Sequence, residues 1–281
     1  YGVNITATSG SIGHYRYLLW DIVPTDEKDP FGNTFFSEID VVDQHPAAEP
    51  ESRATVVENS AHRKTIQAEG GCEIVMDTTG ATDLTEWSDR ELVPMIKEWY
   101  PKIVAMLPSE NYTAPKRLSV AIREMDGVAF TSGTRISCSA EWMRRELKGE
   151  AMGAVFHELV HVVQQYGRAR RNNRSNGPSS GWIVEGIPDY VRWYIYEPQT
   201  RGAEISERNI ARARYDGSYR ISANFLNWVV QNHDKELIRK LNAVMREGEY
   251  REELWNTWTG RTVQELGDQW KAALAAKVAK P

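Results

Sequence analysis

An apolar stretch in the middle of the chain contains two histidines and a glutamate in the order His157-Glu158-x-x-His161. In a helix, residues four apart lie one turn apart on the same face, so the two imidazoles can converge on one point. Zinc requires such convergence, because its bonds to imidazole nitrogens are about 2 Å long. Glu158 adjoins the first histidine, where it can deprotonate a metal-bound water without itself binding the metal. The pattern therefore predicts zinc chemistry with Glu158 as general base.

The neighbouring residues predict that this helix is buried. Apolar side chains fill positions 159–160 and 162–163, and we expect the helix to run from about 149 to 166 with Gly167 as its C-cap. Two histidines and a glutamate are costly to bury without partners. The five-residue pattern alone also occurs in helices that bind no metal. A second group of ligands is therefore needed to support the prediction.

That second group follows a loop predicted over 168–181. A catalytic zinc keeps three protein ligands and an open fourth position. Glu185 stands 24 positions after His161, on a second apolar helix. Asp189 lies four residues further on, where it can accept a hydrogen bond from a zinc-bound imidazole. We predict His157, His161 and Glu185 as zinc ligands, with Asp189 as the partner of a ligand histidine.

Hydrolysis also needs a hydrogen-bond donor for the developing oxyanion. The candidates are Tyr190, Tyr215 and Tyr219. Tyr190 directly follows Asp189 and therefore points away from the face that carries the acids. Tyr219 opens a helix after a turn, where its hydroxyl can reach a cleft, and we favour it. The alternative is a tyrosine that packs in the core with its hydroxyl bonded to the backbone.

The composition excludes several classes of protein. The chain has 281 residues with a net charge of −5 at pH 7, and acidic and basic residues are mixed, which argues against a nucleic-acid partner. No apolar run approaches 18 residues, so we expect no transmembrane segment. The chain begins with Tyr1, which predicts a processed or trimmed product. Cys72 and Cys138 form either one disulfide or two buried thiols.

The expected elements are β, then mixed, then α along the chain, which predicts an α+β fold. Helical spacing appears over 83–107 and again through most of the chain after 182. The predicted strands cover 15–23, 35–42, 54–57, 64–68, 72–77, 117–123, 128–131 and 134–139.

Residues 153–165 (Gly-Ala-Val-Phe-His-Glu-Leu-Val-His-Val-Val-Gln-Gln) and 181–192 (Gly-Trp-Ile-Val-Glu-Gly-Ile-Pro-Asp-Tyr-Val-Arg) resemble the basic secretory protein family of plant and bacterial peptidases. Segments 133–136, 217–226 and 260–270 are similar to it as well, so the resemblance covers about 71–278. The family contains proposed zinc metallopeptidases of the gluzincin type.

The resemblance implies a zincin-like catalytic domain over 71–281, with a small mixed sheet, the histidine-bearing helix and a helical C-terminal half. Residues 1–70 then form a β-rich N-terminal extension. Within this extension, 17–20 and 37–41 resemble the closing strands of galactose-binding jelly rolls. The segment is too short for a whole jelly roll, so we favour a β extension that packs on the catalytic domain, with a glycan or cell-surface contact through residues 1–70 as the alternative.

For the site, the resemblance implies the same three ligands and the same general base, and it supports Asp189 and Tyr219. In gluzincins an edge strand above the zinc helix pairs with extended substrate. By that analogy the substrate strand carries either Val128, Ala129 and Phe130 or Thr134, Arg135 and Ile136.

The chain departs from the family at Pro188, where alanine is common. Proline lacks an N–H and is tolerated within the first turn of a helix, so we expect the second helix to start near Glu185. The mild acidity of the chain also departs from the family's basic character.

These observations predict a secreted or cell-envelope zinc metallopeptidase, an endopeptidase that hydrolyses peptide bonds through a zinc-bound water activated by Glu158. One alternative is a zinc hydrolase of a non-peptide bond. Another is a zinc-stabilised module that binds glycans or the cell surface through residues 1–70 without turnover. The intact Glu158 argues against the second alternative, because a purely structural zinc site does not need it.

Overall fold

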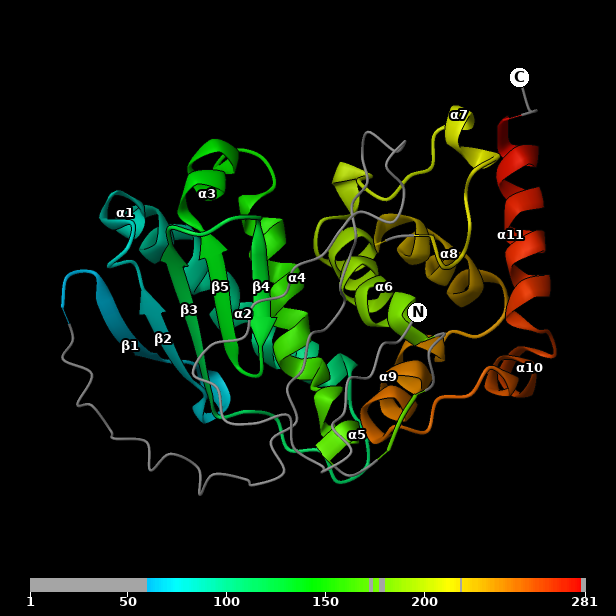
Figure 1. Cartoon of the computed structure of the whole chain (residues 1–281), viewed down its shortest axis with the longest axis horizontal. Helices are drawn as coiled ribbons and strands as arrows, with labels where there is room; N and C mark the ends of the chain where they lie inside the picture. The colour runs from blue at the N-terminus through cyan, green and yellow to red at the C-terminus, as the bar shows by residue number, and fades with distance from the viewer. Residues whose placement is uncertain (1–59, 172–173, 177–179, 218, 279–281) are drawn as a thin grey trace, which may run out of the picture. The chain divides into compact units, whose positions relative to one another are not determined.

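The computed structural model describes residues 60–171, 174–176, 180–217 and 219–278 (Figure 1). The strands predicted at 15–23, 35–42 and 54–57 lie outside these residues, as does most of the predicted N-terminal extension with its glycan contact. The described part is α+β, as the sequence predicts, with one five-stranded mixed sheet followed by helices.

The sheet has the order β1-β2-β3-β5-β4. The central strands β2, β3 and β5 run parallel, while β1 and β4 pair antiparallel at the two edges. Helix α2, Val93–Met106, connects β2 to β3, because parallel neighbours require a crossover. The strands are β1 Arg63–Gln67, β2 Glu73–Asp77, β3 Arg117–Arg123, β4 Ala129–Ser132 and β5 Arg135–Ser139.

The β4–β5 hairpin lies one residue further along the chain than expected. Ser132 pairs with Arg135, so Gly133 and Thr134 form a two-residue turn, and Gly133 has a φ of 61°. Glycine at the first central position permits the positive φ that such tight hairpins need. Thr134 therefore belongs to the turn and not to a strand.

Helices α1 and α2 lie between β2 and β3 in the sequence, and the chain after β5 is helical (Figure 1). The segments 88–92 and 192–196 are π-helical turns that continue neighbouring α-helices. The helices are α1 Thr85–Trp87, α2 Val93–Met106, α3 Ala140–Glu146, α4 Ala151–Gln164, α5 Gly167–Arg171, α6 Gly181–Val191, α7 Glu207–Ile210, α8 Tyr219–Asn232, α9 Leu237–Glu247, α10 Glu253–Thr259 and α11 Val263–Val278.

Helix α4 ends earlier than expected. Its C-cap is Gln165, which adopts the left-handed conformation with a φ of 48°, and Gly167 begins α5. The predicted cap at Gly167 and the predicted loop over all of 168–181 are therefore wrong. The early turn directs Tyr166 into the core, where its hydroxyl donates to Asn242 Oδ1 at 3.2 Å.

The ends of α2 and α4 share one buried cation. Arg246, on α9, donates to the carbonyls of Gln164 (3.0 Å) and Val163 (2.8 Å) at the end of α4 and to that of Leu107 (3.0 Å) after α2. Its guanidinium also lies over the ring of Tyr112. The carbonyls at a helix C-terminus lack partners within the helix and carry a partial negative charge, so one arginine completes both helices.

An aromatic cluster holds α6, α8, α10 and α11 together. Trp182, Phe225, Trp255 and Trp270 lie with neighbouring ring centroids 5.6–5.9 Å apart, and most of their surface is removed from water. Such aromatic pairs add to the stability that burial alone provides.

Cys72 and Cys138 are both buried and free.

Within the described ranges, no helix has the length and apolar character that crossing a membrane requires.

Candidate metal and catalytic centre

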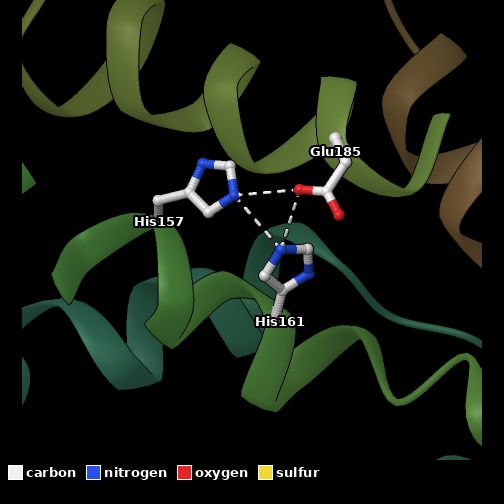
Figure 2. Close-up of side chains that lie close together, drawn as sticks. All are labelled: His157, His161 and Glu185. Carbon is white, nitrogen blue, oxygen red and sulfur yellow. Dashed lines mark hydrogen bonds and ion pairs between the residues drawn. The ribbon is translucent and has the colours of Figure 1, made fainter. Parts of the chain in front are cut away.

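Helix α4 presents His157 and His161 on one face, as their spacing predicts. The helix is buried over most of its length, because it packs between the sheet and the C-terminal helices. Figure 2 shows the two imidazoles turned toward each other, with their Nε2 atoms 3.1 Å apart. An apolar helix thus brings two nitrogen donors to one point beneath the surface.

Helix α6 supplies the third donor. The Oε2 atom of Glu185 lies 3.2 Å from His157 Nε2 and 3.3 Å from His161 Nε2 (Figure 2). The three ligand atoms therefore form a nearly equilateral triangle. In the described part of the chain, this is the group of histidine, cysteine and acidic side chains that could hold a metal ion.

The size of this triangle fits a tetrahedral metal. Two bonds of about 2.0–2.1 Å that meet at the tetrahedral angle hold their ligand atoms about 3.3 Å apart. The measured separations of 3.1–3.3 Å match this value. Two imidazoles and one carboxylate also leave a fourth position open, as catalytic zinc sites do. The residues present are therefore suited to Zn²⁺ in both chemistry and spacing.

Asp189 orients the first histidine. Its Oδ1 atom lies 2.7 Å from His157 Nδ1, on the side of the ring opposite the triangle. A carboxylate accepts hydrogen bonds, so Nδ1 of His157 carries a proton. Its Nε2 atom then faces Nε2 of His161 and Oε2 of Glu185. The contact that the sequence predicted between the two helices is thus present.

Gln164 orients the second histidine, a role that the sequence patterns above do not predict. It is 1% exposed, and its Oε1 atom lies 2.6 Å from His161 Nδ1. Its amide nitrogen donates to the carbonyl of Val184 at 3.1 Å and to the hydroxyl of Tyr166 at 3.2 Å. Because a backbone carbonyl only accepts, these contacts assign the amide orientation and place the acceptor oxygen against His161. Its position three residues after His161, on the same helix face, was the available signal.

The bond from Gln164 explains how α6 tolerates its proline. The helix begins at Gly181 and contains Pro188 in its interior, so the predicted start near Glu185 is wrong. Without an N–H, Pro188 cannot bond the carbonyl four residues earlier, which is that of Val184. Gln164 donates to that same carbonyl. The side chain of Gln164 therefore bonds the carbonyl that Pro188 leaves without its usual donor, and it also orients His161.

The charges of the triangle and of Asp189 stabilise one another. Burial disfavours the charged imidazole of His157, but hydrogen bonds to Asp189 and Glu185 outweigh it and raise its pKa to about 10. Burial likewise disfavours the carboxylate of Glu185, but His161 and His157 lower its pKa to about 2. Without a metal, protonated His157 therefore contributes stability that is complete below its ordinary pKa of 6.5 and is lost as the pH rises through about 10.

Glu158 lies beside the triangle and is held by the sheet. The hydroxyl of Thr131, on β4, lies 2.7 Å from Glu158 Oε2 and 3.0 Å from the Glu158 carbonyl oxygen. The two residues are 27 positions apart in the sequence, so no local pattern could reveal the contact.

Tyr219 lies against the site at the start of α8. Its ring centroid is 5.8 Å from that of His157. Burial raises the pKa of its phenol, and the carboxylates of Glu185, Glu158 and Asp189 raise it further. The phenol therefore keeps its proton at neutral pH. Tyr215 instead donates to Gln264, and Tyr190 stacks on Tyr194.

The two predicted substrate strands differ in their accessibility. Strand β5, with Arg135 and Ile136, is paired on both sides, to β3 and β4, and has no free edge. Strand β4 is an outer strand of the described sheet and packs along α4 (Figure 1). Of the β4 segment, Val128 and Phe130 are exposed and Ala129 is half-buried. The structure therefore leaves β4 as the strand that an extended peptide could join.

Comparison with known proteins identifies the family. A family model described as a peptidase of plants and bacteria matches residues 80–270, which include every residue of the triangle, Glu158, Asp189 and Tyr219. A search of curated proteins gives no match.

Binding of Zn²⁺ at pH 7 is expected to release protons. With a pKa of about 10, metal-free His157 is protonated on both nitrogens at this pH, whereas zinc binds neutral imidazole. The apparent affinity should therefore rise with pH, by about tenfold per unit for each proton displaced. Isothermal titration at one pH in two buffers of different ionisation enthalpy measures the protons released. A binding heat that is the same in both buffers would contradict the prediction.

Replacing Gln164 by Met is expected to lower the affinity for Zn²⁺ by about 10- to 100-fold, because His161 loses the acceptor that orients it. Competition with a chromogenic chelator measures the change. The same substitution at Gln231, an exposed residue of α8, is the control and should leave the affinity unaltered. Wild-type affinity in Gln164→Met would show that the amide does not orient the ligand.

Proposed function

From the premise that the chain belongs to the family of peptidases of plants and bacteria, we propose that it is a zinc-dependent metallopeptidase. The observation that carries the proposal is the triangle of His157, His161 and Glu185, whose spacing suits tetrahedral zinc, with Glu158 beside it. In this proposal the three residues hold one Zn²⁺ ion. The ion would supply Lewis acidity, which polarises the substrate carbonyl and makes water a stronger acid.

Glu158 is the proposed general base. Its carboxylate takes a proton from the attacking water and then passes it to the nitrogen of the leaving amine. Two features support this role. Glu158 is buried next to a ligand histidine, and Thr131 binds its Oε2 atom, which leaves Oε1 available as the proton acceptor.

Tyr219 is the proposed donor to the oxyanion that forms on the substrate carbonyl. A phenol whose pKa is raised by burial and by three nearby carboxylates remains a hydrogen-bond donor at neutral pH. The contact between the rings of Tyr219 and His157 supports a hydroxyl within reach of the reacting group. Asp189 and Gln164 act through the histidines, because each holds one Nδ1–H so that the Nε2 atoms face the ion.

The substrate is proposed to bind as an extended peptide along β4. Main-chain hydrogen bonds to an outer strand recognise any extended peptide, so an internal stretch of a chain can bind, which favours an endopeptidase. The exposed Val128 and Phe130 would then contact substrate side chains. Secretion or attachment to the cell envelope belongs to the same proposal and is supported by the resemblance to secretory peptidases.

Changing Glu158 to Gln is expected to abolish turnover while Zn²⁺ remains bound. The amide keeps the size of the side chain but cannot accept a proton, so kcat should fall by about 10²- to 10⁴-fold. Hydrolysis of labelled casein and metal analysis of the purified variant measure the two properties. His157→Ala serves as the comparison, since it should lose both zinc and activity. A Glu158→Gln protein that cleaves like the wild type would refute the mechanism.

Tyr219→Phe is expected to lower kcat by about 10²-fold with little change in KM, because the lost hydrogen bond forms mainly in the transition state. Steady-state kinetics on a peptide substrate separate the two constants. Tyr215→Phe is the matched control, as the hydroxyl of Tyr215 bonds to Gln264 away from the triangle. A loss confined to KM would argue against oxyanion stabilisation by Tyr219.

A further inference from the structure

The backbone of β4 has two edges with different partners. Val128 O accepts a hydrogen bond from Ser139 N at 2.9 Å, so the main chain of Val128 points toward β5. In an antiparallel pair, the direction of the main-chain groups alternates from residue to residue. The N–H and C=O groups of Phe130 and Ser132 therefore also point toward β5. Those of Ala129 and Thr131 point toward the free edge, where a peptide would pair.

The side chains of β4 point alternately to the two faces of the sheet, perpendicular to the main-chain hydrogen bonds. Phe130 and Ser132 are exposed, whereas Ala129 and Thr131 are half-buried and face α4. The hydroxyl of Thr131 reaches both the Oε2 atom and the carbonyl oxygen of Glu158, at 2.7 and 3.0 Å. Thr131 thus has its main chain on the edge open to a peptide and its side chain on the residue proposed as general base.

We propose that Thr131 is a positioning residue that couples the binding of an extended peptide on β4 to the orientation of the Glu158 carboxylate. This inference rests on the proposed peptidase function. It assigns to Thr131 two simultaneous tasks, one for the main chain and one for the hydroxyl, that no other residue of β4 combines in the described structure.

The hydroxyl determines which carboxylate oxygen is free. A threonine hydroxyl has one hydrogen to donate, so the carbonyl oxygen of Glu158 at 3.0 Å and its Oε2 atom at 2.7 Å compete for it, and the shorter contact with the charged acceptor favours Oε2. With Oε2 held by Thr131, the plane of the carboxylate is restrained and Oε1 is presented to water. A glutamate without this bond would sample several rotamers, and fewer of them would suit proton transfer.

Peptide binding would strengthen the restraint. A substrate strand that bonds to the main chain of Ala129 and Thr131 immobilises β4, and the hydroxyl of Thr131 then holds Glu158 more firmly. The free energy gained when the peptide pairs with β4 would thereby raise kcat, because peptide binding orients the Glu158 carboxylate, which acts in the transition state. Longer peptides should therefore be cleaved faster at saturation and not merely bound more tightly.

The test compares substitutions that remove the hydroxyl with one that keeps it. In Thr131→Val we expect kcat on a quenched fluorescent peptide to fall about 10- to 100-fold, with KM within about twofold of wild type. In Thr131→Ser, which retains the hydroxyl, kcat should remain within about threefold. Bound zinc should be unaltered in both. If Thr131→Val does not fold, Thr131→Ala against Thr131→Ser makes the same comparison.

A series of peptides of increasing length tests the coupling itself. In the wild type, kcat should rise once the peptide is long enough to pair with β4, and Thr131→Val should lose this dependence while Thr131→Ser keeps it. Wild-type kcat in Thr131→Val, equal losses in the Val and Ser variants, or an effect on KM alone would overturn the inference. A wild-type protein that cleaves no peptide, or an active Glu158→Gln variant, would instead overturn the proposed function, and the inference with it.

Discussion

The carbonyl oxygen of Val184 loses its ordinary helical donor, the N–H four residues later, because that residue is Pro188, and the bond that takes its place determines the geometry of the site. Pro188 removes the N–H that would have bonded it, and the side chain of Gln164 takes that place. An unpaired buried carbonyl costs about 1–3 kcal/mol, so α6 has a strong preference for the position in which Gln164 reaches it. Glu185 is the next residue after Val184. The same bond that completes α6 therefore sets the position of Glu185 relative to His161.

The site depends on a balance of buried charges. The two acids of α6 and the two histidines of α4 are poor occupants of an apolar layer when each is taken alone. Together they form a group in which each imidazole donates through Nδ1 to a neighbour, Asp189 or Gln164, and directs Nε2 inward. When no ion is bound, protonated His157 offsets the acids, which raises the pKa of His157 and contributes to the lowered pKa of Glu185. A divalent cation can replace that proton without rearrangement of the side chains.

The sequence predicted the parts of the site that depend on short-range spacing. Residues four apart on an apolar helix must share a face, so His157 and His161 could be paired on this basis alone, and so could Glu185 with Asp189. The contact of Glu158 with Thr131 spans two elements, and its existence depends on which strand becomes the outer one. Both candidate strands had similar patterns, and their order in the sheet is a property of the whole fold.

Two of the local predictions that failed did so because tertiary contacts replaced the usual local rules. Gly167 was expected to cap α4, yet Gln165 takes the left-handed conformation, because the turn there lets Tyr166 enter the core. Pro188 was expected near a helix start, yet it lies inside α6, because a side chain from another helix bonds the carbonyl that it leaves open. Helix propensity and capping rules describe a segment by itself. The end of α4 and the proline in α6 depart from these rules because contacts from other parts of the fold stabilise them.

The arginine that completes α2 and α4 lies far along the chain, 82 positions after Gln164. A ribosome releases residues from the N-terminus onward, so the histidine-bearing helix emerges well before Arg246 does. Until α9 has been synthesised, the last carbonyls of α4 lack this partner, and the turn that carries His161 and Gln164 is free to fray. The order of synthesis thus delays the completion of the site until most of the chain exists. The last turn of α4 therefore gains its cation partner only when translation has passed residue 246.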